Sequence, residues 1–373
     1  MNATHIVLTT INDGAILLDL AANAAHYGRK ATVWVIADRK TSTECYQNSQ
    51  EARKLGLDMH YLTPQDQDEA MRKFPEFYLR LPWNSDARRN VGYLLAYEAG
   101  CERLIIMDDD NYPHEDDFIG SHEIVGKEYV GMMTNNGDGY YNYLRQAEYQ
   151  SALPPYPRGY PYFARGILNR TDINDGMVGI NIGVWLGDPD IDAMTWILDP
   201  FQVDDWIRLP GMLARNTWTP INSQNTCFIR DLIPAAMFVP QRYAGIEFMD
   251  RFGDIFAGYF MQAVNEDYLT HIGAPIVIHR RNSHNHITDL FLEAPGIAIL
   301  EYLLPLLKNF RGDGLAVIDR YLELAGFLAK TSRDLPNNLP PQAGDWLMET
   351  ARTMIGYAKA CQMIEGAHQE VRP

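Results

Sequence analysis

The chain has 373 residues, 46% of them hydrophobic and 21% charged, a balance typical of a folded globular protein rather than a disordered one. Its 32 Lys and Arg against 48 Asp and Glu give a formal net charge of −16, and no long basic stripe is present, so we expect no binding to nucleic acid. The four cysteines form no C-x-x-C pair, and the first ten residues, MNATHIVLTT, lack the pattern of a signal peptide. These features favour a cytoplasmic protein without a zinc site or a disulfide framework.

The first third of the chain alternates short β-branched runs with helical patterns. The runs predict strands at residues 4–11, 31–38, 59–64 and 103–110, and the patterns between them predict helices at residues 14–28, 49–56 and 85–102. This alternation predicts a doubly wound, mainly parallel α/β sheet, in which ligands bind at the carboxyl ends of the strands. Neither G-x-G-x-x-G nor G-x-x-x-x-G-K-[ST] occurs, which argues against a Rossmann dehydrogenase and a P-loop NTPase.

Polar side chains stand at the carboxyl ends of three predicted strands: Thr9, Thr10 and Asn12; Asp38; and Asp108, Asp109 and Asp110. In an extended segment Asp108 and Asp110 point to the same side. Carboxylate oxygens suit Mg²⁺ or Mn²⁺, and such an ion on a diphosphate helps a nucleotide leaving group to depart. The alternative is an acidic turn that caps the following helix.

The second half of the chain has a mixed pattern. Strands are predicted at 128–135 and 177–186, a functional Tyr/Pro/Gly-rich loop at 149–166, and a helix at 250–269. A strand from 274 ends in basic and His residues. Helical patterns follow from residue 286, so we expect a catalytic domain over 1–285 and a helical subdomain over 286–373.

Two apolar features of the predicted helical subdomain allow more than one interpretation. The stretch APGIAILEYLLPLL, interrupted by Pro295 and Pro305, is too short for a bilayer span, so no integral membrane segment is expected. An apolar stripe of Leu315, Ile318, Tyr321 and Leu322 predicts a helical subdomain or a homo-oligomer interface, with a membrane-surface role as the alternative.

Six segments in order resemble a known family: IIMDDDNYP, PRGYPYFARG, GVWLGDPDIDA, FIRDLIPAAMF, RFGDIFAGY and GAPIVIHRRNSHN. The D-x-D after an apolar strand resembles the nucleotide-sugar site of GT-A fold glycosyltransferases. Over residues 80 to 295 the chain is more specifically similar to the reversibly glycosylated polypeptides, the UDP-arabinopyranose mutase family. The sequence departs from the family pattern at Gly253, where the family has an acid, and at Ile182, where it has a histidine.

The resemblance implies a GT-A-like domain with a Rossmann-like, nucleotide-sugar-binding mixed sheet, whose Asp108 and Asp110 hold Mn²⁺ or Mg²⁺ together with His279. It also implies that Arg158 becomes glycosylated. A guanidinium is a poor nucleophile, so Arg158 needs a neighbouring carboxylate, for which Asp254 is the candidate. Arg165, on the same loop, is the alternative acceptor.

Further residues are candidates for contacts to a nucleotide sugar, most simply a UDP-sugar: Thr9, Asp38, Arg88, Arg89, Asn90, Asp108, Asp109 and Asn225. The structural alternatives are an ordinary turn at Asp38 and a solvated helix start at Arg88 to Asn90. His284 and His286 allow a three-His metal cluster with His279, although two loop histidines beside one ligand are the simpler interpretation.

Three functions follow from these features. The resemblance implies a self-glycosylating mutase that interconverts pyranose and furanose forms of a UDP-sugar. The alternatives are a glycosyltransferase that uses an external acceptor and a non-catalytic partner subunit that binds nucleotide sugar.

Overall fold

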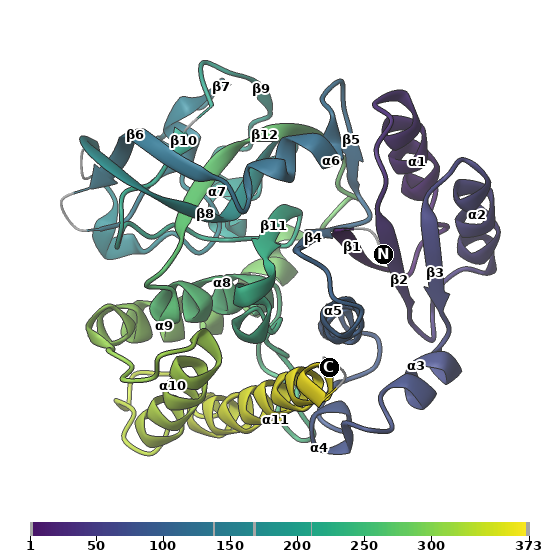
Figure 1. The fold of residues 1–373 in the computed structure, drawn as a ribbon. Helices are drawn as coiled ribbons and strands as arrows, with labels where there is room; N and C mark the ends of the chain where they lie inside the picture. Colours follow the sequence, from purple (N-terminus) through teal and green to yellow (C-terminus); the bar gives the residue numbers. More distant parts are fainter. Residues whose placement is uncertain (1–2, 137–138, 167–168, 210, 371–373) are drawn as a thin grey trace.

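The computed structural model describes residues 3–136, 139–166, 169–209 and 211–370, and a curled sheet runs through its centre (Figure 1). Eight strands form the main path: β1 (Thr4–Thr10), β2 (Thr32–Ala37), β3 (Asp58–Leu62), β4 (Arg103–Met107), β8 (Asn169–Gly187), β10 (Gly211–Met212), β11 (Asn225–Ile229) and β12 (Leu269–His279). Their order is β10-β12-β8-β11-β4-β1-β2-β3. Four strands join at the side: β5 (Asn111–Pro113), β6 (Glu128–Asn136), β7 (Ala147–Tyr149) and β9 (Val203–Trp206).

Strand directions bring distant segments to one edge of the sheet. β1 pairs in parallel with both β2 and β4, as the alternating pattern predicts. β11 is antiparallel to β4 and to β8, so the sheet as a whole is mixed, which confirms the mixed GT-A-like sheet that the resemblance implies. Because Asn225 lies opposite Met107, the chain enters β11 at the edge where β4 ends. β8 and β12 also end there, since His279 lies opposite Gly187.

Eleven α-helices occur in the described part of the chain: α1 (Ile16–His26), α2 (Thr43–Lys54), α3 (Pro64–Ala70), α4 (Pro75–Tyr78), α5 (Arg89–Glu98), α6 (Phe118–Ser121), α7 (Ala193–Leu198), α8 (Gly253–Val264), α9 (His286–Asn309), α10 (Val317–Thr331) and α11 (Ala343–Glu370). α2 begins earlier than predicted because the Ser42 hydroxyl accepts from the backbone N–H of Glu44 and caps it. Ser85 similarly caps a 3₁₀ turn, Asp86–Arg88, that leads into α5. Gly92 lets α5 approach β1, because a Cβ there would lie 2.6 Å from Val7 Cγ1.

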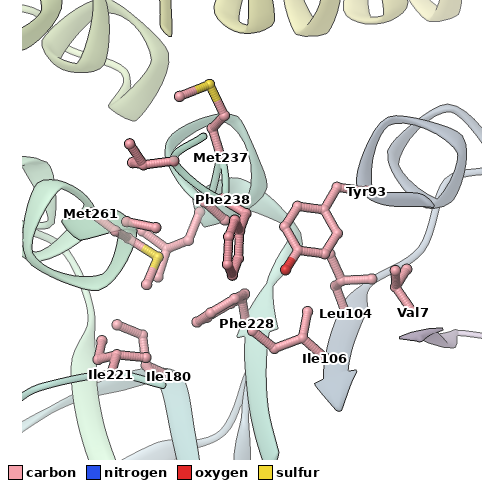
Figure 2. Close-up of a cluster of buried hydrophobic side chains, with 14 of the residues drawn as sticks. Val7, Tyr93, Leu104, Ile106, Ile180, Ile221, Phe228, Met237, Phe238 and Met261 are labelled. Carbon is pink, nitrogen blue, oxygen red and sulfur yellow. The ribbon is translucent and has the colours of Figure 1, made fainter. Parts of the chain in front are cut away.

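A cluster of buried side chains joins the sheet to α5 and α8 (Figure 2). Ile106 and Phe228 project from β4 and β11, and Tyr93 of α5 and Met261 of α8 pack toward them around Phe238; each is 5% exposed or less. Removal of one of these large side chains would cost about 3–5 kcal/mol of folding free energy. This packing fixes the first turn of α8 relative to the sheet, which matters because that turn carries a site residue.

The helices after residue 285 pack on the rest of the chain. α10 packs on α8, and α11 packs on α5 along the lower part of Figure 1. Trp346 of α11 donates from its indole nitrogen to the Pro240 carbonyl at 3.1 Å. Ile318 and Tyr321 are buried within the chain, whereas Leu315 is 96% exposed. Only part of the predicted apolar stripe therefore serves internal packing, and an oligomer interface stays a prediction.

α9 corrects the expectation that its apolar stretch is too short for a membrane span. It continues through Pro295 and Pro305 for 24 residues, and it is the one helix in the described ranges that is long and apolar enough to cross a membrane. Its Leu300, Leu303 and Leu304 are nevertheless buried in the core. Length and composition are therefore weak evidence for a membrane helix here, because a buried core helix has the same features.

Candidate active site

Two adjoining cavities lie at the carboxyl edge of the sheet. The outer cavity opens over the ends of β1 and β2 and is lined by Thr9, Asp38, Arg88 and Arg89, among others. The inner cavity surrounds Arg158. Both cavities share four lining residues: Asp86, Asp108, Asp110 and His284. A ligand that extends from one cavity into the other therefore fits the arrangement.

The three successive aspartates have three different environments. Asp108 accepts from Arg89 Nη2 at 2.8 Å and from the Ser223 hydroxyl at 3.0 Å. Burial raises the pKa of Asp108 to about 6, against the opposing charge of Arg89. Asp109 accepts from Thr10 and from Asn12, so it holds the end of β1.

Asp110 and His279 have the geometry that suits a divalent ion. Asp110 Oδ2 lies 3.4 Å from His279 Nε2. His279 Nδ1 lies 2.5 Å from the Asp188 carbonyl, which can only accept, so Nδ1 carries a proton, and Nε2, which is 3.1 Å from Gln224 Nε2, faces Asp110. Burial alone would lower the pKa of His279, but the hydrogen bond and charge of Asp110 raise it overall.

This donor set fits a partly coordinated ion. Within the described ranges, no group of three or more His, Cys, Asp or Glu side chains is gathered as a metal site. Mg²⁺ and Mn²⁺ commonly keep water and phosphate oxygens in their shell, so one carboxylate and one imidazole suffice for the protein's share. His284 and His286 instead pair with Asp289 at 3.2 and 3.6 Å, which argues against the three-His cluster.

Arg158 is buried between two carboxylates. Its Nε donates to Asp190 at 2.7 Å, its Nη2 donates to Asp254 at 2.8 Å, and its Nη1 donates to the Arg251 carbonyl. Burial lowers the pKa of the guanidinium, but the two carboxylates outweigh burial and raise it well above its ordinary value. Burial also opposes ionisation of Asp190, yet Arg158 lowers the pKa of that carboxyl overall.

Local structure explains why this arginine lies here. The Arg158 N–H donates to the Asp190 carbonyl at 2.8 Å, and Gly159 follows with φ +80°. A Cβ on Gly159 would lie 2.3 Å from Ile255 Cγ2, so only glycine fits between the loop and α8. Asp254 occupies the first turn of α8, where the helix dipole favours a carboxylate.

Asp190 is one of the site residues that sequence reasoning missed; Ser223 and Arg281 are others. Asp190 follows β8 in the segment GVWLGDPDIDA, which carried part of the family resemblance but no assigned role. Its position after a strand was the available clue, because the carboxyl ends of β4 and β8 meet at this edge. With Asp190, the guanidinium has two carboxylates although residue 253 is glycine.

Several predicted ligand residues hold the fold instead of lining a cavity. Asn90 is fully buried and exchanges two hydrogen bonds of 2.8 Å with the Phe238 backbone. Asn225 is also buried, and its side-chain Oδ1 lies 3.0 Å from His122 Nε2. Arg165 lies outside the set of residues that line the two cavities, with its Nη2 3.0 Å from Asp192 and its guanidinium 3.6 Å above the Tyr162 ring.

The basic residues of the outer cavity are engaged by the protein. Arg88 Nη2 donates to Gln67 Oε1 at 2.6 Å, and its guanidinium lies 3.7 Å above the Trp83 ring. These contacts hold Arg88 in the wall of the outer cavity. Arg89 bridges Thr9 and Asp108. Asp38 accepts from the backbone N–H groups of Arg39 at 2.6 Å and Ser85 at 3.2 Å while its side chain lines the cavity.

A curled mixed α/β sheet with D-x-D at the end of β4 defines a protein with a GT-A-like fold. The family model for reversibly glycosylated polypeptides matches residues 56–345, so the chain belongs to that family. It is 23% identical over 250 residues to UDP-arabinopyranose mutase 2 of Arabidopsis thaliana, covering 66% of this chain. It is 24% identical over 232 residues to UDP-arabinopyranose mutase 1 of Oryza sativa subsp. japonica, covering 61% of this chain. These alignments span 65% and 60% of the two relatives' own lengths.

Proposed function

We propose that the chain is a metal-dependent UDP-sugar mutase that captures the sugar on Arg158 and returns it to the nucleotide in another ring form. One observation carries this proposal: Arg158 lies buried between Asp190 and Asp254 in the same cavity that Asp108 and Asp110 line. The names of the relatives support the reaction class.

The outer cavity suits the nucleoside and the inner cavity suits the sugar. In the outer cavity, Asp38 and Thr9 offer hydrogen-bond acceptors and donors to a ribose or base. In the inner cavity, Arg158 lies beyond the aspartates that both cavities share. Asp110 and His279 would hold a divalent ion, which would neutralise charge on the diphosphate. Reaction at the anomeric carbon then takes place beside the guanidinium.

In the capture step, one of the two carboxylates accepts the proton that the guanidinium nitrogen loses. The bond from the anomeric carbon to the phosphate oxygen breaks, and its electron pair leaves with UDP. A guanidinium nitrogen forms the new bond and gives its proton to the adjacent Asp190 or Asp254. Two carboxylates serve this step better than one, because one accepts the proton while the other still pairs with the cation.

Ring exchange uses the same proton. The nitrogen lone pair expels the ring oxygen of the bound sugar, and the carboxylic acid protonates that oxygen. A different sugar hydroxyl then adds to the same carbon and returns its proton to the carboxylate. Attack by UDP on the anomeric carbon, with reprotonation of the nitrogen, completes the cycle.

Incubation with UDP-arabinopyranose and Mn²⁺, followed by chromatography of the nucleotide sugars, tests the proposal. We expect a UDP-arabinofuranose peak from the parent, no such peak with EDTA, and at least a hundredfold lower rate for Asp254→Asn. Consumption of the donor with sugar found only on an added acceptor would instead indicate a glycosyltransferase. Donor binding without conversion would indicate the non-catalytic partner.

A further inference from the structure

The segment after β12 runs along the junction of the two cavities. His279 and Arg281 line the inner cavity, Asn282 lines the outer cavity, and His284 lines both. Arg280 is exposed, with its guanidinium 5.1 Å from the Tyr112 ring. If a nucleoside occupies the outer cavity and a sugar the inner one, the diphosphate that links them passes this segment.

Arg281 differs from the other two arginines of the inner cavity. Arg158 pairs with Asp190 and Asp254, and Arg251 pairs with Glu293 at 2.7 Å. Arg281 has a buried Nη1 with no hydrogen-bond partner, and the described residues offer its guanidinium no ion pair within 4.0 Å.

The position of Arg281 is fixed through its backbone. Its N–H donates to the Asp188 carboxylate at 2.9 Å, and its guanidinium lies 5.7 Å from the Trp196 ring. Burial lowers the pKa of this guanidinium, the nearby charge of Arg251 lowers it further, and the charge of Asp190 offsets part of this lowering. A partly desolvated cation with an unpartnered N–H and no contacting carboxylate is unfavourable unless an anion completes the site.

We propose that Arg281 binds the sugar-bearing phosphate of the nucleotide sugar and retains UDP while the sugar is on Arg158. The inference rests on the proposed function and deepens it. The sugar-bearing phosphate is favoured over the phosphate attached to uridine, because Arg281 lines only the inner cavity, on the Arg158 side of the junction. That phosphate gains negative charge when the sugar leaves, so its attraction to Arg281 increases in the transition state and in the captured state.

Retention of UDP gives Arg281 a function in the mutase cycle. The sugar must return to a nucleotide after ring exchange, and loss of UDP would leave it on the protein. A fixed cation that binds the terminal phosphate of UDP keeps UDP in the site, where it can attack the sugar in the return step. Arg281 is thus a binding and positioning residue for the reversible half of the reaction.

Calorimetric titration of uridine, UMP and UDP in the presence of Mn²⁺ tests the assignment. The variants are Arg281→Gln, Arg281→Lys and Arg280→Gln, the last as a matched control from the adjacent exposed position. We expect Arg281→Gln to weaken UDP binding at least tenfold, which is about 1.4 kcal/mol, and to leave uridine and UMP binding within twofold. Arg281→Lys should recover part of the loss, and Arg280→Gln should match the parent.

Melting of the ligand-free proteins serves as the folding control. Because Arg281 has an unsatisfied buried N–H, Arg281→Gln should melt no lower than the parent. An unchanged UDP-to-UMP affinity ratio in Arg281→Gln, with UDP still bound by the parent, would overturn the assignment of Arg281 alone. One such case is equal weakening of UMP and UDP binding, which would place the contact at the phosphate attached to uridine. Failure of the parent to bind UDP would overturn the proposed function and this inference with it.

Discussion

Removal of the Arg158 guanidinium should make the stability of the protein depend on pH in a new way. In the parent, Arg158 pairs with both Asp190 and Asp254, at 2.7 and 2.8 Å. Arg158→Ala leaves two buried carboxylates without their cation, and such a loss costs about 3–5 kcal/mol of folding free energy at pH 8. At pH 5 one carboxylate can take up a proton, so the cost should fall by about 1–2 kcal/mol.

The sign follows from the pKa of Asp190. In the parent its folded-state pKa is lowered, so it contributes stability above its unfolded pKa and loses that contribution as pH falls through the folded value. Without Arg158, burial raises the folded-state pKa, so the contribution is present below the unfolded pKa and is lost as pH rises. The stability difference between parent and variant should therefore grow from pH 5 to pH 8.

Urea unfolding at pH 5, 6, 7 and 8 measures this difference directly. Arg165→Ala is the matched control, because Asp192 keeps hydrogen bonds from Tyr162 at 3.0 Å and from Thr195 at 2.7 Å when Arg165 is gone. Its stability difference from the parent should be nearly independent of pH. A difference for Arg158→Ala that stays the same between pH 5 and pH 8 would refute the two-carboxylate clamp.

Three further predictions concern separate parts of the site. Asp110→Asn should weaken Mn²⁺-dependent UDP binding at least tenfold while uridine binding without metal stays unchanged; calorimetry measures both, and equal losses would contradict a metal role. Gly159→Ala should lower stability by about 1–3 kcal/mol in urea unfolding because of its φ of +80° and its contact with Ile255, whereas Gly326→Ala, with open space around it, should not. Asn225→Ala should cost about 1–3 kcal/mol of stability but leave KM for the UDP-sugar unchanged, and a raised KM would restore a ligand role.

The sequence predicts the strands that carry the site better than it predicts their directions. β1, β2 and β4 are β-branched runs with helices between them, so their parallel pairing follows from a local pattern. β11 is a five-residue strand whose antiparallel direction depends on contacts with β4 and β8. No local pattern determines that direction, so the mixed sheet was expected from the family resemblance and not from the residues alone.

The site residues also divide into those that a local sequence pattern reveals and those that depend on contacts between distant segments. Asp108, Asp110 and His279 stand at the ends of apolar runs, where edge position is readable from the sequence. Asn225 has the same polar character, but the buried ring of His122, far away in the sequence, engages it. Asp190 was missed for the converse reason, because its contact with Arg158 joins two loops.

Intact mass after incubation with UDP-arabinopyranose and Mn²⁺ tests most directly whether Arg158 captures the sugar. The account predicts a pentose-sized increment on the parent and on Arg165→Ala, none on Arg158→Ala, and removal of the increment by excess UDP. An increment on Arg158→Ala equal to that on the parent, or mutase turnover by Arg158→Ala at the parent rate, would contradict it.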